Sequence, residues 1–189
     1  MSKVRLISGK WGGRWLPGEI SQATHPMSER ARNAIFSMLN ARTTLTDTKI
    51  LDAFAGTGAV GLEALSRGAS RVTFIERDRK AQQSLKQNIA ALDAGNDCNV
   101  VCTTVANWMK YGDSSDKYDI IFADPPYNLP QFSTVWRLLA YLKNNGLMIL
   151  SSQTAKSVEY PKGVAVVEIR SYGGASISIL KIDKELINN

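Results

Sequence analysis

Short apolar runs alternate with amphipathic helical segments along this chain, and the alternation predicts an α/β protein with helices between its strands. Five runs have the length and composition of buried strands, at residues 49–54, 71–75, 98–103, 118–123 and 146–150. Helical spacing of apolar residues occurs at 28–39, 62–67, 78–92 and about 131–143. Because open α/β sheets bind ligands at the carboxyl ends of their strands, the residues directly after each run are candidates for chemistry.

Two of the predicted helices have recognisable start signals. Ser28 and Asp78 are predicted N-caps, and Glu29 lies in a first turn, where negative charge is favourable. The predicted buried faces are Ala31, Ala34, Ile35, Met38 and Leu39 in the first helix, and Ala81, Leu85, Ile89 and Leu92 in the second. Arg30 and Arg32 are expected to project elsewhere, towards solvent or substrate.

The patterns at the two ends of the chain predict a hairpin or an extended arm at the N-terminus and an antiparallel hairpin at the C-terminus. Residues 4–8 and 13–16 flank a glycine-containing turn, and residues 164–170 and 175–182 are joined through Tyr172-Gly173-Gly174. Residues 17–26 show no periodicity and are interpreted as a connection. We therefore expect a basic hairpin extension over residues 1–26 and one compact domain over residues 27–189.

The composition is that of an ordinary soluble globular protein, with 189 residues, 44% hydrophobic and 21% charged. No apolar run approaches the length of a membrane span, and the first residues lack a signal-peptide core. Cys98 and Cys102 have no metal-ligand spacing and are expected to be reduced core residues of a cytoplasmic protein. His25, the only histidine, cannot form a metal cluster alone. We expect no metal, no membrane partner and a monomer.

The net charge of +6 is concentrated near the N-terminus, where residues 1–42 hold seven basic and two acidic residues, a balance of +5. A basic end on a nearly neutral body favours nucleic acid as the partner, although a solvated charged face has the same composition. Arg5, Lys10 and Arg14 interleave with Trp11 and Trp15. Two interpretations of the tryptophans remain open: they stack on bases, or they dock the hairpin on the domain.

The strand at 118–123 ends at Asp124-Pro125-Pro126-Tyr127, the most informative stretch of the sequence. Neither proline can donate to a sheet ladder and each fixes its own φ, so the turn is stiff and extended. It offers a carboxylate, backbone carbonyls and a flat ring, which suit a planar base with an exocyclic amino group. Taken alone, the stretch is also compatible with a plain loop.

The strand at 49–54 leads into a loop with Gly56, Gly58 and Gly61 and then into a helix, which is the arrangement of a nucleotide-cofactor site. Glu76 ends the next strand and is placed to accept both hydroxyls of a ribose; an exposed strand-end charge is the alternative. Asp52 is an awkward neighbour for a pyrophosphate but suits the ammonium and sulfonium of S-adenosylmethionine. The sequence therefore favours S-adenosylmethionine over NAD.

With these residues identified, the chain resembles the class I S-adenosylmethionine-dependent methyltransferases. More narrowly it is similar to the RsmD family, which methylates the N2 amino group of a guanine, position 966, in 16S ribosomal RNA. The resemblance rests on the opening at residues 5–11, the loop at 52–58 and the turn at 124–127. The chain departs from the family pattern at His25, Met27, Ser28, Thr104 and Val105.

The resemblance implies a Rossmann-like, seven-stranded, mostly parallel sheet with helices on both faces, a C-terminal antiparallel hairpin and a small N-terminal hairpin extension. It implies S-adenosylmethionine as cofactor and ribosomal RNA, the small subunit or an assembly intermediate as partner. The implied catalytic residues are Asp124, Pro125, Pro126 and Tyr127; the cofactor-binding residues are Asp52, Phe54, Ala55, Gly56, Thr57, Gly58, Gly61, Glu76, Arg77, Thr104 and Val105; the RNA-binding residues are Arg5, Lys10, Trp11, Arg14, Arg30 and Arg32. The loop 104–108 is expected to flank the adenine ring.

In the implied reaction, an Asp124 oxygen and the Pro125 carbonyl accept the hydrogens of guanine N2, which directs its lone pair towards the methyl group, and Tyr127 stacks on the base. Other functions remain open: methylation of DNA adenine or protein glutamine, an NAD dehydrogenase, or a non-catalytic RNA-binding protein. The basic aromatic arm argues against a protein substrate. The lack of a hydride-transfer relay argues against a dehydrogenase, and the complete turn at 124–127 against a non-catalytic protein.

Overall fold

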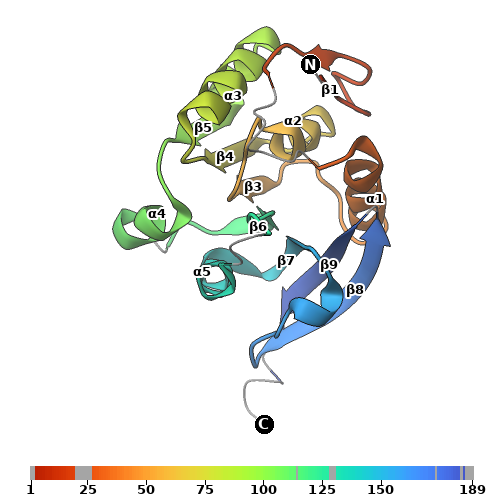
Figure 1. Cartoon of the computed structure of the whole chain (residues 1–189), viewed down its shortest axis with the longest axis vertical. Helices are drawn as coiled ribbons and strands as arrows, with labels where there is room; N and C mark the ends of the chain where they lie inside the picture. The colour runs from red at the N-terminus through yellow and green to blue at the C-terminus, as the bar shows by residue number, and fades with distance from the viewer. Residues whose placement is uncertain are drawn as a thin grey trace.

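In a computed structural model of the chain, a seven-stranded sheet forms the centre of the molecule, with strand order β5-β4-β3-β6-β7-β9-β8 (Figure 1). The structure describes residues 3–19, 27–113, 115–127, 131–172, 174–183 and 185. The strands of this sheet are β3 (Lys49–Asp52), β4 (Arg71–Ile75), β5 (Cys98–Val101), β6 (Tyr118–Ala123), β7 (Leu142–Ser152), β8 (Val164–Tyr172) and β9 (Ala175–Ile182). Strands β3 to β7 are parallel, and β9 runs antiparallel to both of its neighbours. The predicted sheet and its C-terminal hairpin are confirmed.

Helices cover both faces of the sheet, as predicted. The helices are α1 (Glu29–Asn40), α2 (Ala59–Ser66) and α3 (Arg79–Ala91) on one face and α4 (Val105–Tyr111) and α5 (Phe132–Arg137) on the other, with 3-10 turns η1 (Gly95–Asp97), η2 (Leu138–Tyr141) and η3 (Ala155–Ser157). Within the described ranges, none of the helices combines the length and apolar character that a membrane span requires.

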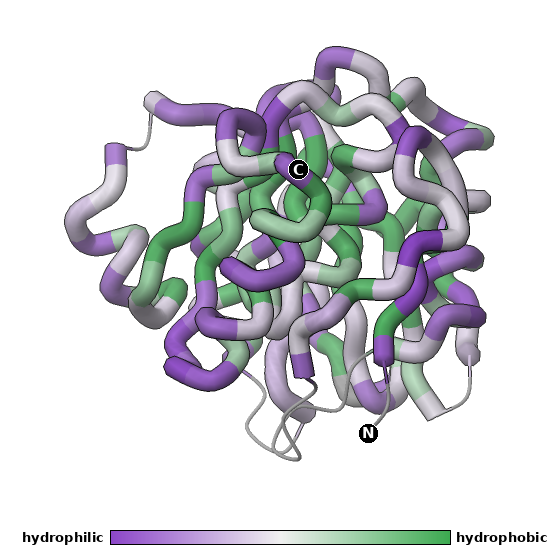
Figure 2. The backbone as a smooth tube through the Cα atoms, turned by 90° about the horizontal axis from the view of Figure 1, so that it is seen from above, coloured by the Kyte–Doolittle hydropathy of each residue, from purple (hydrophilic) through white to green (hydrophobic). Residues whose placement is uncertain are grey.

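Alternation along the strands builds one apolar core on each face. Ile50 packs with α1, α2 and α3, whereas its neighbour Leu51 packs with α4 and α5, because successive strand residues point to opposite faces. Figure 2 shows the apolar residues gathered in the interior of the molecule and polar ones along its outside. The two layers hold the strand ends rigidly, which is what a site at those ends requires.

The predicted helix starts are confirmed by their caps. The Ser28 hydroxyl accepts a hydrogen bond from the Ala31 N–H at 3.2 Å, and Asp78 accepts one from the Ala81 N–H at 2.9 Å. The predicted buried face of α3 is also confirmed. In α1, Ala31, Ile35, Met38 and Leu39 are buried as predicted, whereas Ala34 is only partly buried. Phe36 and Arg32 join the buried face in addition.

Several predicted boundaries are wrong. The helix expected to reach residue 143 ends at Arg137, and β7 begins at Leu142, where the polar stretch 143–145 conceals the strand pattern. The expected loop at 104–108 is the start of α4, because the Thr104 hydroxyl accepts a hydrogen bond from the Asn107 N–H at 3.1 Å and caps the helix. Cys102 is exposed and not a core residue, since β5 ends one residue before it.

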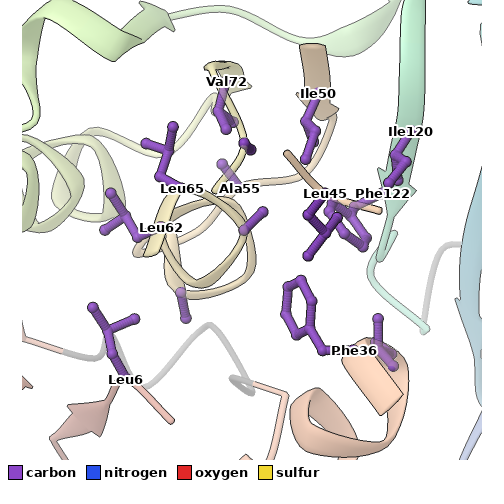
Figure 3. Close-up of a cluster of buried hydrophobic side chains, with 14 of the residues drawn as sticks. Leu6, Phe36, Leu45, Ile50, Ala55, Leu62, Leu65, Val72, Ile120 and Phe122 are labelled. Carbon is purple, nitrogen blue, oxygen red and sulfur yellow. The ribbon is translucent and has the colours of Figure 1, made fainter. Parts of the chain in front are cut away.

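The N-terminal hairpin consists of β1 (Val4–Arg5) and β2 (Trp15–Leu16), which pair antiparallel. It is shorter than predicted but it does not stand apart from the domain. Leu6 and Leu16 are completely buried in the same core as α1 and α2, and Figure 3 shows Leu6 directed towards the cluster that holds Leu62. The predicted division near residue 26 lies outside the described residues and stays a prediction.

Candidate active site

Three predicted carboxylates meet at the carboxyl ends of β3, β4 and β6. Asp52 is the last residue of β3, Glu76 follows β4, and Asp124 follows β6. Because β3 lies between β4 and β6, and the chain crosses from one side of β3 to the other, this is the switch point at which open α/β sheets bind ligands. The structure thus brings together side chains that are up to 72 positions apart in the sequence.

Two of these carboxylates hold the glycine loop between β3 and α2. Asp52 accepts the Gly61 N–H at 3.0 Å, and the Glu76 oxygens accept the N–H groups of Gly56 and Asp78, both at 2.7 Å. Each Glu76 oxygen retains a lone pair that can accept a ribose hydroxyl. Glu76 is partly buried rather than an exposed strand-end charge.

The three glycines of the loop serve different purposes. A Cβ on Gly56, whose φ is +55°, would meet nothing within 4 Å, so this residue faces open space. A Cβ on Gly58 would lie 2.3 Å from Leu85, and one on Gly61 would lie 2.3 Å from Phe74. Gly56 therefore allows a ligand to approach the backbone, while the other two allow α2 to pack on α3 and β4.

Two of the three carboxyls of the site are harder to ionise than a carboxyl in water. Burial raises the pKa of Asp52 to about 7, and the charges of Asp124 and Glu76 raise it further against the lowering effect of the Gly61 N–H. Burial also raises the pKa of Asp124 to about 6, although hydrogen bonds from Ser151 and Tyr127 lower it. A cation placed among these groups would favour the ionised form of each.

The turn after β6 lines a cavity beside Asp124. The cavity has a volume of about 140 Å³ and is lined by Pro125, Pro126, Tyr127, Phe132, Ser151, Ser152 and Gln153. The Tyr127 hydroxyl lies 2.5 Å from that of Ser151, a buried residue of β7. Sequence reasoning missed the β7 residues and Phe132, although the polar run directly after the strand at 146–150 pointed to the same sheet edge.

The remaining predicted cofactor residues occupy varied positions. Phe54 is partly buried against the core of the α4 face, Ala55 and Thr57 are buried, and Arg77 is exposed. Thr104 is partly buried at the start of α4, whereas the Val105 side chain packs in the core. The predicted contact with adenine at 104–105 therefore lies at a helix N-terminus rather than in a loop.

Arg32 does not project towards solvent or substrate, so that prediction is wrong. Only 2% of the residue is exposed, and its guanidinium donates to the carbonyls of Arg5 at 2.8 Å and Met27 at 3.0 Å. Burial lowers the pKa of Arg32, although the charges of Glu63 and Glu29 oppose this effect. Arg32 ties α1 to the hairpin and has no surface left to offer to RNA.

The two tryptophans of the hairpin differ in role. Trp11 is buried and docks the hairpin, with the Lys10 ammonium 4.2 Å above its ring. Trp15 is 61% exposed, and the Arg5 guanidinium lies 5.9 Å from its ring centre. Trp11 therefore fits the docking interpretation, whereas stacking of the exposed Trp15 on a base stays a prediction. The predicted basic residues on the outside are Arg5, Lys10, Arg14 and Arg30.

Residues of α2 that sequence reasoning missed hold the hairpin in place. The completely buried Glu63 accepts the N–H groups of Ile7 at 2.7 Å and Ser8 at 3.0 Å. The turn of the hairpin lies against Ser66, whose carbonyl oxygen would be 1.8 Å from a Cβ on Gly9. No local pattern marks these contacts, because the partners are more than 50 positions apart.

Comparison with known proteins gives consistent matches over almost the whole chain. The family described as "Conserved hypothetical protein 95" matches residues 4–181. Ribosomal RNA small subunit methyltransferase D of Haemophilus influenzae is 30% identical over 175 residues, or 90% of each chain. The protein of the same name from Escherichia coli is 36% identical over 154 residues, which cover 80% of this chain and 75% of that one. A solved structure, "Putative methyltransferase yhhF from Escherichia coli", superposes with a TM-score of 0.82 at 30% identity and covers 96% of this chain and 99% of its own.

Proposed function

The chain belongs to the RsmD family, described as conserved hypothetical protein 95, and from this membership we propose that it is a methyltransferase of small-subunit ribosomal RNA. In the proposed reaction, a methyl group moves from S-adenosylmethionine to the N2 amino group of a guanine, at position 966 of the 16S molecule. The observation that carries the proposal is the convergence of Asp52, Glu76 and Asp124 at one sheet edge, next to a cavity that can take a flat base.

The side chains of the site fit S-adenosylmethionine better than a dinucleotide. Three carboxylates lie at one sheet edge, and the charges of Asp124 and Glu76 act on Asp52. Such a site favours an ammonium and a sulfonium and disfavours a pyrophosphate. Glu76 has acceptor capacity left for the ribose hydroxyls, and Gly56 leaves room for the ligand beside the backbone. The cofactor supplies a methyl group on a positively charged sulfur, which is electrophilic without help from a metal.

The cavity beside Asp124 is proposed to hold the guanine base. Tyr127 and Phe132 offer aromatic surface for stacking, and Ser152 and Gln153 offer polar groups towards the base edge. The Ser151 hydroxyl pairs with the Tyr127 hydroxyl, and hydrogen bonding from this pair acts on Asp124, so one buried side chain of β7 orients both proposed catalytic groups. The base must leave the RNA stack to reach this position.

The proposed reaction needs alignment and charge, and no covalent intermediate. Guanine N2 donates one hydrogen to Asp124 and the other to the Pro125 carbonyl, so that its lone pair faces the methyl group. The N–C bond forms while the S–C bond breaks, and the positive charge moves from sulfur to N2. N2 then loses one proton. Asp124, with a pKa of about 6, stabilises the developing charge and can accept that proton for release to water.

Binding of RNA is assigned to the exposed basic side of the hairpin and α1. Arg5, Lys10, Arg14 and Arg30 are exposed there, and Trp15 provides a ring next to Arg5. Such contacts position the phosphate backbone and contribute an affinity that depends on salt.

The direct test is methyl transfer to ribosomal RNA in single-turnover conditions, followed by mass spectrometry of the modified nucleotide. The proposal expects N2-methylguanine at one position in small-subunit RNA, either naked or within the subunit. Methylation of adenine alone, or of protein, would overturn it. The matched control is Asp113→Ala, which removes an exposed carboxylate directly after α4 and should leave the rate unchanged.

The proposed cofactor is tested separately by calorimetric titration. We expect binding of S-adenosylmethionine and of its demethylated product S-adenosylhomocysteine, and no binding of NAD. Tight binding of NAD without binding of S-adenosylmethionine would refute the assignment of the glycine loop.

A further inference from the structure

Asn88 of α3 connects the N-terminal hairpin to the glycine loop between β3 and α2, called the cofactor loop below, through its side-chain amide. The side chain is completely buried. Its Oδ1 accepts the Gly18 N–H at 2.7 Å, and its Nδ2 donates to the Thr57 carbonyl at 2.9 Å. Gly18 lies in the segment that leaves β2, and Thr57 lies between two glycines of the loop. One amide therefore joins two parts of the chain that the sequence separates by 39 positions.

The two partners fix the orientation of this amide. A backbone N–H can only donate and a carbonyl can only accept, so only one placement of the oxygen and nitrogen of Asn88 satisfies both. Both hydrogen bonds are buried, and loss of either would leave a buried polar group without a partner. Aspartate has the same shape but cannot donate to Thr57, which makes the position chemically specific.

The Thr57 carbonyl is a third anchor of the cofactor loop. Asp52 and Glu76 hold the loop through the N–H groups of Gly61 and Gly56, and both carboxylates come from the sheet. Asn88 instead holds the loop from α3, on the side where the hairpin lies. It determines the direction of the Thr57–Gly58 peptide group, one residue after Gly56, the glycine that faces open space.

The segment at residues 18–19 forms hydrogen bonds with two side chains of α3, Ser84 and Asn88, and of these two Asn88 also bonds to the cofactor loop. A Cβ on Gly18 would lie 2.6 Å from the Ser84 carbonyl oxygen and 2.8 Å from Asn88 Oδ1. The Ser84 hydroxyl donates to the carbonyl of Glu19 at 2.8 Å but makes no contact with Thr57 among the described hydrogen bonds. This difference provides a matched pair of variants.

We propose that Asn88 is a positioning residue through which the seating of the hairpin supports the cofactor loop. It follows that cofactor affinity depends on Gly18, which lies in the hairpin segment and is not one of the residues assigned to the ligand. The inference rests on the proposed function only for the identity of the cofactor. Such a coupling is reciprocal, so cofactor binding must in turn stabilise the contact at Gly18.

The test is calorimetric titration with S-adenosylhomocysteine of the wild type, Gly18→Ala, Ser84→Ala, Asn88→Asp and the Gly18→Ala/Asn88→Asp double variant, with the thermal unfolding midpoint of each measured without ligand. We expect Gly18→Ala and Asn88→Asp each to weaken binding by about fivefold or more, and Ser84→Ala to stay within about twofold of the wild type. The double variant should bind as Asn88→Asp does, because both changes break one connection.

Unchanged affinity in Gly18→Ala, an equal loss in Ser84→Ala, or additive losses in the double variant would overturn the inference. If Gly18→Ala does not fold, hydrogen exchange of the wild type decides: S-adenosylhomocysteine should slow exchange of the Gly18 amide but not of the Leu6 amide, which bonds to Arg14 within the hairpin. No slowing at Gly18 would refute it. Failure of the wild type to bind S-adenosylhomocysteine would instead refute the proposed function.

Discussion

Replacement of Asp52 by asparagine tests the electrostatics of the site through the pH dependence of folding. The Asp52 carboxyl has a pKa of about 7 in the folded protein, compared with an ordinary value of 3.8. Between these two values the folded state holds a proton that the unfolded state has lost. The free energy of unfolding therefore falls as pH rises from about 4 to about 7. A difference of about 3 pKa units corresponds to about 4 kcal/mol, as an upper figure for this residue.

The magnitude is measured by urea unfolding, monitored by tryptophan fluorescence, at a series of pH values in the absence of cofactor. The free energy of unfolding of the wild type minus that of Asp52→Asn should be most positive below pH 4. This difference should fall by up to about 4 kcal/mol by pH 7.5. The asparagine oxygen can still accept the Gly61 N–H, so the loop keeps its hydrogen bond. The raised pKa of Asp124 also makes the free energy of unfolding fall with rising pH. Because Asp124 is present in both proteins, this contribution largely cancels in the difference.

Addition of S-adenosylmethionine should reverse the preference of Asp52 for the protonated form. Two cationic groups next to the carboxylate favour its ionisation, so binding near pH 6.5 should release a proton and affinity should rise with pH until about 7. Titrations in buffers of different ionisation enthalpy measure the released proton. Parallel pH profiles of stability for the wild type and Asp52→Asn, with equal proton release, would refute the reasoning.

Three further predictions concern the other parts of the site. Asp124→Ala should abolish most methyl transfer in single-turnover assays with little change in S-adenosylmethionine affinity. Partial activity of Asp124→Asn would show that the residue acts mainly by aligning the base. Near-normal turnover of the alanine variant contradicts the mechanism. Glu76→Ala should weaken cofactor binding by about 1.5–3 kcal/mol for each charge-assisted hydrogen bond lost, and unchanged affinity in calorimetry would remove Glu76 from the site. Neutralisation of Lys10 and Arg14 together should lower RNA affinity and flatten its salt dependence without an effect on the cofactor; loss of cofactor binding instead would show that these side chains are structural.

The parts of the fold that could be predicted from the sequence are those set by local patterns. The caps at Ser28 and Asp78 depend on neighbours three positions away, and the strands around Asp52 and Asp124 show their apolar runs directly. The order of elements then places the strand ends at one edge. For this reason Glu76 could also be predicted next to the glycine loop.

The parts that could not be predicted depend on partners distant in the sequence. Arg32 has the sequence pattern of a surface charge on a helix, and one of the acceptors that hold it buried, the carbonyl of Arg5, is 27 positions away. Glu63 and Asn88 lie on helices as ordinary polar residues, and their roles exist only because the hairpin packs against them. The same holds for Ser151, whose role depends on the pairing of β7 with β6.

The contact of Gly9 with α2 has a consequence for the kinetics of association. Because the turn lies directly on the Ser66 carbonyl, with no space for a side chain, the basic hairpin is ordered during folding and not on encounter with RNA. In the proposed binding of RNA, its charges act as a fixed patch that steers the approach of the polyanion, so the association rate should depend strongly on ionic strength. Binding by this surface should also show a small heat-capacity change, since a large one accompanies segments that fold as they bind.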